Sequence, residues 1–307
     1  MTYRLLDFGS YTVSGRTLSV TEGVPREVFF TQSASYNYDP RGHFSVEHAY
    51  VQYFIPEKRN NLPPVILVHG GGMHGSTWET TPDGRPGWLN LLIAHGYEVH
   101  VLDNVERGRS GFAPGLWQGD PILRSHEEAW VLFRIGEKEG FPQRQAFTGS
   151  LFPVEWFDSF AQMIVPRWLT TTSLHVAALV DTLRRTGPAI VICHSQGGEI
   201  VFDAAGIAPE CVAGIIAIEP SVTFESADTM PSVPCVLFMG DFLKSEPHWS
   251  QRADTWVKSQ SLAGDTVELI QSGKDCAKGH THFPMLDQRS DEVLKLCLQS
   301  MEKRLAQ

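Results

Sequence analysis

The chain of 307 residues has little cysteine, no excess of positive charge and no apolar run long enough to span a bilayer. Its five cysteines are widely spaced and form no C-x-x-C pair, which fits reduced thiols better than a disulfide framework or a zinc site. The formal net charge of -10 argues against a nucleic-acid or anionic-membrane partner, because both require clustered positive charge. What remains is a globular composition, 42% hydrophobic, with enough length for a substantial core.

The opening stretch MTYRLLDFGSYTVSGRTLSV carries Arg4 and Asp7 where a secretion signal would need an apolar core. We therefore expect a cytoplasmic protein with no membrane partner and no nucleic-acid partner, and we leave a homodimer open.

The hydrophobic pattern changes after Pro64. Before it, residues 17–20, 27–30 and 49–55 are short strand-like runs, as in an antiparallel edge that leads into a sheet. After it, apolar strands alternate with amphipathic helices, which is typical of a parallel sheet covered by helices on both faces. The expected strands are 65–70, 97–103, 189–193, 213–219, 234–240 and 266–271, and the expected helices are 87–96, 173–187, 197–207, 254–262 and 291–305.

Residues 104–172 interrupt this alternation. They contain two predicted helices, at 126–136 and 154–168, joined by Gly- and Pro-rich connections. The segment is too long for a simple connection, so we interpret it as an inserted cap on a single domain that spans residues 1–307. Its aromatic side chains either line a substrate pocket or pack the cap onto the sheet; they include Trp130, Phe133, Trp156, Phe157, Phe160 and Trp168.

The stretch VICHSQGGEI places Ser195 between a predicted strand and a predicted helix. This is the context of a nucleophile elbow, in which a sharp turn presents the serine hydroxyl above the sheet. The match to G-x-S-x-G is imperfect, because Cys193 stands in the first position and Gly197 in the second. The alternative is a helix N-cap serine with no chemical role.

A glycine-rich loop, VHGGGMHG at residues 68–75, follows the first parallel strand and resembles the H-G-G-G loop of esterases. Such loops supply backbone N–H groups to an oxyanion hole, and glycine leaves the space for the oxyanion open. We expect the donors to be the amides of Gly71, with Gly72 as the alternative, and of Gln196. His69 is interpreted as structural. The loop lacks the Gly-Lys-Ser/Thr ending of a phosphate-binding loop.

Two histidines near the C-terminal end, His280 and His282, are candidates for a general base. An H-x-H pair also suits a metal, but no acidic or cysteine cluster of matching spacing accompanies it. We therefore expect no metal and no cofactor.

Six segments, in order along the chain, resemble an α/β-hydrolase, and more narrowly a bacterial serine esterase group whose triad acid is glutamate. They are HGGGMHGSTWETTPDGRPGW, VLDNVERGRS, HEEAWVLFRIG, HSQGG, IEPS and HFPMLDQRS. The resemblance implies an α/β-hydrolase fold with Ser195 as nucleophile, Glu219 as acid and His282 as base. Members of the group carry a vicinal cysteine pair where this chain has Gly71 and Gly72. They also carry an export signal, which we do not expect for this chain.

The acid has a second candidate. In most α/β-hydrolases the carboxylate follows the strand after the one that ends at Glu219, and there this chain has Asp241. A glutamate is one methylene longer and could reach the base from the neighbouring strand, so we favour Glu219.

The sequence therefore predicts a serine hydrolase that cleaves a small-molecule carboxylic ester or lactone. The alternatives are an amide or carbon–carbon bond hydrolase on the same triad, and a non-catalytic protein of the same fold that binds an apolar ligand.

Overall fold

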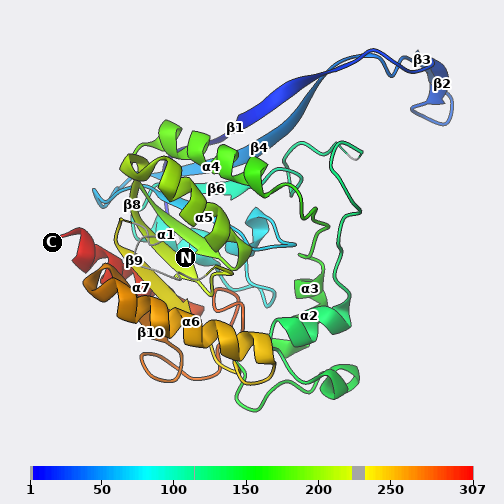
Figure 1. Ribbon diagram of the computed structural model, residues 1–307. Coiled ribbons are helices and arrows are strands. Elements are labelled where there is room, and N and C mark those ends of the chain that lie inside the picture. Colours follow the sequence, from blue (N-terminus) through cyan, green and yellow to red (C-terminus); the bar gives the residue numbers. More distant parts are fainter. Residues whose placement is uncertain (1–2, 114, 223–231, 307) are drawn as a thin grey trace.

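The computed structural model describes residues 3–113, 115–222 and 232–306, which are built around an eight-stranded sheet (Figure 1). Its strands are β1 (Leu5–Val20), β4 (Gly42–Pro56), β5 (Val65–Val68), β6 (Val99–Asp103), β7 (Ala189–His194), β8 (Val212–Ile218), β9 (Cys235–Met239) and β10 (Val267–Gln271). They lie in the order β1-β4-β6-β5-β7-β8-β9-β10. β4 pairs antiparallel with both β1 and β6, and the other neighbours pair parallel. The predicted parallel sheet with an antiparallel edge is therefore confirmed.

Helices cover both faces of this sheet. α1 (Trp88–Ala94) and α7 (Ser290–Leu305) lie on one face, and α4 (Thr172–Thr186), α5 (Gln196–Ile207) and α6 (Pro247–Ala263) lie on the other. Alternate residues of β5 pack against the two helix layers. Val65 and Leu67 pack on the side of α1 and α7, and Ile66 and Val68 pack on the side of α4, α5 and α6. A strand buried on both faces needs an unbroken apolar run, and this explains the sequence VILV.

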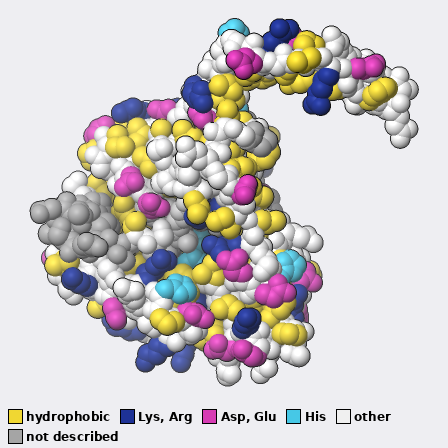
Figure 2. Space-filling view, turned by 45° about the vertical axis from the view of Figure 1, so that its right-hand side comes forward, with side chains coloured by type: hydrophobic (Ala, Val, Ile, Leu, Met, Phe, Trp, Pro, Cys, Tyr) yellow, Lys and Arg dark blue, Asp and Glu magenta, His cyan; other side chains and the backbone are white. Residues whose placement is uncertain are grey.

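A two-stranded arm projects from the edge of the sheet. β1 and β4 continue beyond the body, and at the tip β2 (Arg26–Phe29) pairs antiparallel with β3 (Ser35–Tyr38). Figures 1 and 2 show the arm standing clear of the rest of the molecule, with hydrophobic side chains along it.

The inserted segment is less helical than predicted. It contains α2 (His126–Leu132), 3-10 turns at Lys138–Gln143 and Val154–Trp156, and α3 (Phe157–Ala161). The prediction of one helix over 154–168 is wrong. Pro166 disfavours a helical conformation at Val165, whose amide instead donates to the Gly72 carbonyl at 2.8 Å. Further 3-10 turns lie outside the insert at Gly75–Trp78, Pro209–Cys211 and Gly264–Thr266.

α6 begins earlier than the predicted residue 254, because Pro247 occupies its first turn, a position that tolerates proline. The extra turns carry His248, Trp249 and Arg252 toward the carboxyl ends of the strands. The other predicted helices of the main sheet are confirmed. In the described ranges, no helix combines the length and the apolar character that crossing a bilayer requires.

Candidate active site

Ser195 occupies the sharp turn between β7 and α5. Its backbone has φ 50° and ψ -117°, a region that a non-glycine residue enters only under constraint from its surroundings. The turn is tight: a Cβ at Gly197 would lie 2.9 Å from the carbonyl oxygens of Val68 and His69. The Ser195 side chain makes no capping hydrogen bond, so the N-cap interpretation is wrong.

Glu219 directly follows β8, the neighbour of β7, and is fully buried. One carboxylate oxygen, Oε2, accepts a hydrogen bond from His282 Nδ1 at 2.6 Å. The other, Oε1, accepts from the Gly240 amide at 2.6 Å and from the guanidinium of Arg134. Three donors therefore bond this carboxylate, and at least one bonds each oxygen, which compensates for its burial.

The electrostatics keep this pair as a carboxylate and a neutral imidazole at neutral pH. Burial acts to raise the pKa of Glu219, but Arg134 and the hydrogen bond from His282 outweigh it and lower that pKa from 4.5 to about 2. Burial lowers the pKa of His282 from 6.5 to about 4, although the hydrogen bond to Glu219 opposes this. Arg134 and Arg252 add to the lowering at His282.

The proton on His282 Nδ1 is held by Glu219, which leaves Nε2 as the basic nitrogen of the neutral ring. Aromatic rings enclose the imidazole: the Phe133 ring stacks on it at 5.8 Å and the Trp249 ring lies 4.7 Å away, between centroids. Ser195 and His282 line the same cavity. Within the described ranges the Ser195 hydroxyl has no hydrogen-bond partner, and in unliganded enzymes the bond between nucleophile and base is often long.

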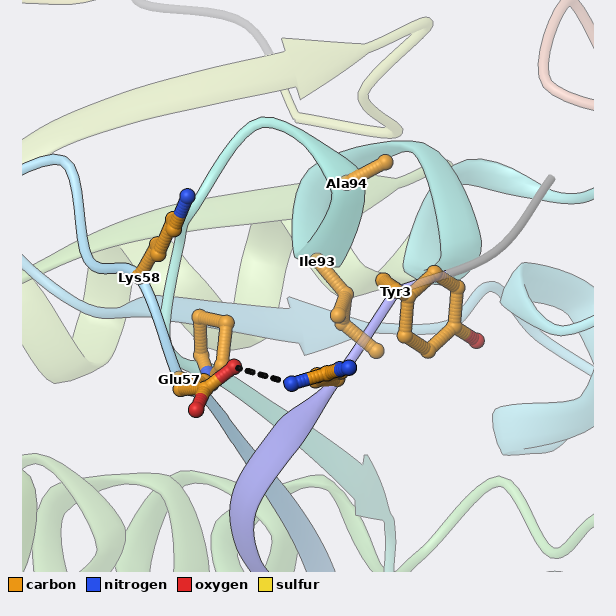
Figure 3. A pocket seen from close by; sticks show the side chains of 7 residues that line it. Tyr3, Glu57, Lys58, Ile93 and Ala94 are labelled. Atoms are coloured by element: carbon orange, nitrogen blue, oxygen red, sulfur yellow. Dashed lines mark ion pairs between the residues drawn. The ribbon is translucent and has the colours of Figure 1, made fainter.

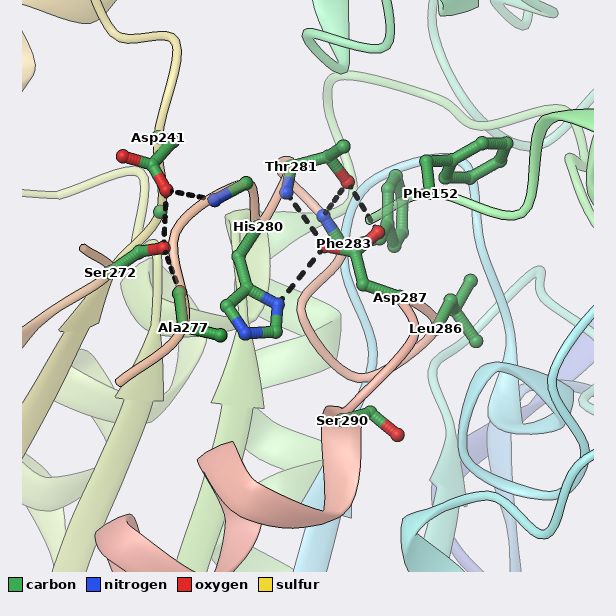
Figure 4. A network of polar contacts seen from close by, with 12 residues as sticks. Phe152, Asp241, Ser272, Ala277, His280, Thr281, Phe283, Leu286, Asp287 and Ser290 are labelled. Atoms are coloured by element: carbon green, nitrogen blue, oxygen red, sulfur yellow. Dashed lines mark hydrogen bonds and ion pairs between the residues drawn. The ribbon is translucent and has the colours of Figure 1, made fainter. Parts of the chain in front are cut away.

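The other two candidates, His280 and Asp241, belong to a separate polar network (Figure 4). His280 is fully buried, with Nδ1 3.4 Å from an oxygen of Asp287. The Asp241 carboxylate accepts from Ser272 Oγ and from the Gly279 amide, so it holds the loop before His280 rather than a histidine ring. Neither His280 nor Asp241 lines the cavity with Ser195.

Gly71 and Gln196 lie together at one wall of the cavity. The side chain of Gln196 accepts a hydrogen bond from Arg167 Nη1 at 2.9 Å, and a Cβ on Gly71 would lie 2.0 Å from the same nitrogen. An alanine at position 71 would therefore require the Arg167 guanidinium to move. In the part of the chain that the structure describes, the backbone N–H groups of Gly71 and Gln196 have no acceptor. Nearby, His69 Nε2 accepts from the Asn104 amide at 3.1 Å, which agrees with its structural interpretation.

The cavity that contains Ser195 has a volume of about 240 Å³. Its lining comes from the sheet edge, the insert and α6. Of the six aromatic residues of the insert named from the sequence, only Phe133 lines this cavity. Trp156 is 49% exposed, and the other four are buried in the core: Trp130, Phe157, Phe160 and Trp168. The lining residues are Gly71, Arg124, Leu132, Phe133, Arg167, Ser195, Gln196, Glu199, Ser221, His248, Trp249, Arg252 and His282.

Larger hollows lie elsewhere. One of about 670 Å³ is lined by His74 and Ser76 among others, and the Ser76 hydroxyl lies 3.1 Å from His74 Nε2, but no carboxylate of the described residues bonds the His74 ring. Figure 3 shows another of about 380 Å³ between the start of β1 and the end of α1, lined by Tyr3, Glu57 and Ile93 among others. Its one marked interaction is an exposed ion pair between Arg4 and Glu57 at 4.0 Å, and its lining residues include no histidine, serine or cysteine. Volume alone does not identify the site; the cavity at Ser195 is distinguished by its side chains.

Comparison with known proteins gives the family. The model of a family described as "Alpha/beta hydrolase family" matches residues 65–275. The chain belongs to the alpha/beta hydrolase family. A bacterial esterase whose structure is known at atomic resolution is 28% identical, with a TM-score of 0.85 over 99% of this chain and 98% of that one. The predicted α/β-hydrolase fold is thereby confirmed.

A probable secreted lipase from a fungal species (strain ATCC 74256) is 32% identical over 189 residues. The match covers 56% of this chain and 49% of that protein, so the chain spans about half the length of this curated relative. This chain, an alpha/beta hydrolase, is thus similar to a probable lipase over part of its length and to a bacterial esterase over nearly all of it.

Four side chains at the site of this alpha/beta hydrolase were missed by sequence reasoning: Arg134, Arg167, Trp249 and Arg252. Arg134 lies 85 positions before its partner Glu219, and only the fold brings the two together. The segment that contains it, HEEAWVLFRIG, resembles the esterase group, but the resemblance assigned no role to its arginine. An arginine within an otherwise apolar helix end was the available signal, because arginine is rarely fully buried without a partner.

Proposed function

We propose that this alpha/beta hydrolase cleaves a carboxylic ester or lactone through an acyl-enzyme on Ser195. The observation that carries the proposal is the 2.6 Å hydrogen bond between Glu219 and His282, in the wall of the cavity that contains the strained Ser195 turn. The likeness to a bacterial esterase over nearly the whole chain supports ester chemistry.

In the first half of the reaction, His282 Nε2 takes the proton of Ser195 Oγ as the oxygen attacks the substrate carbonyl. Glu219 holds the imidazole in the required tautomer and stabilises the imidazolium that forms. The amides of Gly71 and Gln196 donate to the oxyanion, and Arg167 beside them adds positive charge. His282 then protonates the leaving alcohol, or the alkoxide of an opened lactone ring.

In the second half, His282 removes a proton from water, which attacks the acyl-enzyme, and Ser195 regains its proton as the acid is released. Each step uses groups of this chain and water.

The test is hydrolysis of p-nitrophenyl acetate and butyrate by the wild-type protein, by Ser195→Ala and by Ser261→Ala, in which an exposed serine on α6 is changed. We expect turnover by the wild type and Ser261→Ala, and a loss of at least about 10³ in kcat for Ser195→Ala. Equal activity of Ser195→Ala and the wild type would refute the proposal.

A further inference from the structure

The cavity at Ser195 has an excess of positive charge. Three arginines line it, each from a different part of the chain: Arg124 precedes α2, Arg167 follows α3, and Arg252 lies on α6. Glu199 is the one carboxylate among the lining residues that the structure describes.

The arginines retain unused donors. Arg124 forms an ion pair with Glu128, whose side chain is half exposed. Arg167 donates from Nη1 to the neutral amide of Gln196, and its Nε is buried without a partner among the described residues. Arg252 has no hydrogen bond or ion pair with a described residue; its guanidinium carbon lies 5.1 Å from the Trp249 ring centroid. Arg167 and Arg252 thus line the cavity without an ion pair to a carboxylate of the described residues.

Burial and mutual repulsion make this arrangement unfavourable in the empty protein. Burial lowers the pKa of Arg167, and the nearby charge of Arg124 lowers it further, against the opposing effects of Glu106 and Glu199. A bound anion would relieve the repulsion and accept the unused N–H donors.

The size of the cavity limits where such an anion could lie. A volume of 240 Å³ is below the usual range of about 300–1,000 Å³ for ligand pockets, so any group that fills it lies close to its walls. The adjoining hollow of about 450 Å³, which shares Leu132 and His248, carries Glu127, Glu128 and Glu246 and one lysine, Lys138, so an anion is disfavoured there.

Arg167 also indicates which half of the substrate carries the charge. It contacts Gly71 and Gln196, the residues assigned to the oxyanion hole, and so borders the position of the acyl carbonyl. A charged group on the acyl side would therefore lie near Arg167, in the cavity that Arg252 also lines.

We propose that the substrate is a monoester of a short dicarboxylic acid, or a lactone that carries a free carboxylate, and that this carboxylate is bound by Arg167 and Arg252 while Ser195 attacks the esterified carbonyl. This proposal rests on the proposed function and names the substrate class of the same site.

The test compares monomethyl glutarate with methyl 5-methylhexanoate, in which an uncharged isopropyl group replaces the carboxylate. For the wild type we expect kcat/KM to be at least about tenfold higher for the charged ester at low salt, and this advantage to shrink as salt rises. Arg252→Met should lower kcat/KM for the charged ester by about 10- to 100-fold, the scale of a hydrogen bond to a charged group. The loss caused by the same variant should be at least about fivefold smaller for the uncharged ester, and Arg41→Met, on the projecting arm, should change neither.

The outcomes separate the two proposals. Hydrolysis of both esters with no preference for the charged one, or an equal effect of Arg252→Met on both, would overturn the charge assignment and leave the serine mechanism standing. If neither ester reacts, the deciding measurement is the rate at which a fluorophosphonate labels Ser195 with and without glutarate. Slower labelling with glutarate, abolished by Arg252→Met, supports the proposal. An unchanged labelling rate overturns it. A Ser195 that no fluorophosphonate labels refutes both.

Discussion

Arg134 and Glu219 form an ion pair in which neither side chain has any exposed surface. The guanidinium also donates from Nε to the Asp241 carbonyl at 2.8 Å and lies over the Trp249 ring, 4.3 Å from its centroid. It therefore joins the insert to β8, β9 and α6 directly behind the proposed base. Without this cation, Glu219 would be a buried carboxylate with only His282 and one backbone amide to compensate it.

Replacement of Arg134 by methionine should destabilise the protein strongly. It leaves a buried carboxylate without its cation, and breaking such a pair lowers the free energy of unfolding by about 3–5 kcal/mol. Urea unfolding at pH 7 measures this. The control is Arg289→Met, which breaks an exposed pair with Glu292 and should change stability by less than about 1 kcal/mol. Equal effects of the two variants would show that the buried pair adds nothing to stability.

The pH dependence of the same pair has a definite sign. The folded pKa of Glu219 is about 2, below its ordinary 4.5, so its contribution to stability is present above pH 4.5 and is lost as the pH falls toward 2. In Arg134→Met, burial without the cation raises the pKa of Glu219, so the difference in stability between variant and wild type should narrow at low pH.

As the pH is lowered, kcat/KM should begin to fall only at a pH well below 6.5, the ordinary pKa of histidine. His282 must be neutral to act as a base, and its pKa is about 4 rather than 6.5, so kcat/KM should stay high down to about pH 5. Arg252 contributes to this lowering, so Arg252→Gln should move the fall in kcat/KM to higher pH. Initial rates on an uncharged ester between pH 3.5 and 8 measure both. A fall near pH 6.5 in the wild type would contradict the account of the base.

Glu219→Gln and Asp241→Asn discriminate between the two candidate acids. Both changes are nearly isosteric. Glu219→Gln should lower kcat by about 10⁴, the scale seen when a triad carboxylate becomes an amide, because the amide supports the wrong imidazole tautomer. Asp241→Asn should keep most of the activity, since its carboxylate bonds Ser272 and Gly279 rather than a histidine. A folded, inactive Asp241→Asn beside an active Glu219→Gln would reverse the assignment.

Gly71→Ala should impair catalysis without unfolding the chain. The added Cβ would lie 2.0 Å from Arg167 Nη1, so the guanidinium or the loop must move, and we expect a loss of about 10²–10³ in kcat. Gly206→Ala is the control: no heavy atom lies within 4 Å of its Cβ, and alanine in α5 should raise stability by roughly 0.5–1 kcal/mol. Alanine keeps the backbone N–H at position 71, so a fully active Gly71→Ala would show that Arg167 can move away from this position without loss of catalysis.

The sequence predicted the sheet well, because the strands from β5 onward are short and mostly apolar runs, and most of them are followed by a helix pattern. Ser195 could be found for the same reason, as the polar residue where a strand meets a helix. The usual position of the acid in α/β-hydrolases indicated Asp241, and the resemblance around IEPS indicated Glu219. In the structure, Glu219 accepts a hydrogen bond from His282. The catalytic roles of these residues remain predictions.

What the sequence could not show is the part of the site that depends on distant contacts. Trp249 and Arg252 were missed because α6 was predicted to begin after them, and its first turns have weak apolar periodicity. The shortened helix α3 follows from Pro166 and from the contact of Val165 with Gly72, more than 90 positions away. The role of Arg134 could not be predicted, because only the folded chain shows that the insert packs against the end of β8.

The most direct test of the central claim is the mass of the intact protein after reaction with a fluorophosphonate, with the modified residue located by peptide sequencing. The wild type should gain one adduct, on Ser195, because an activated serine attacks phosphorus as it attacks a carbonyl. His282→Ala should react far more slowly, and Ser195→Ala should gain none. An adduct on another residue, or labelling that survives in Ser195→Ala, would contradict the assignment of Ser195 as the nucleophile.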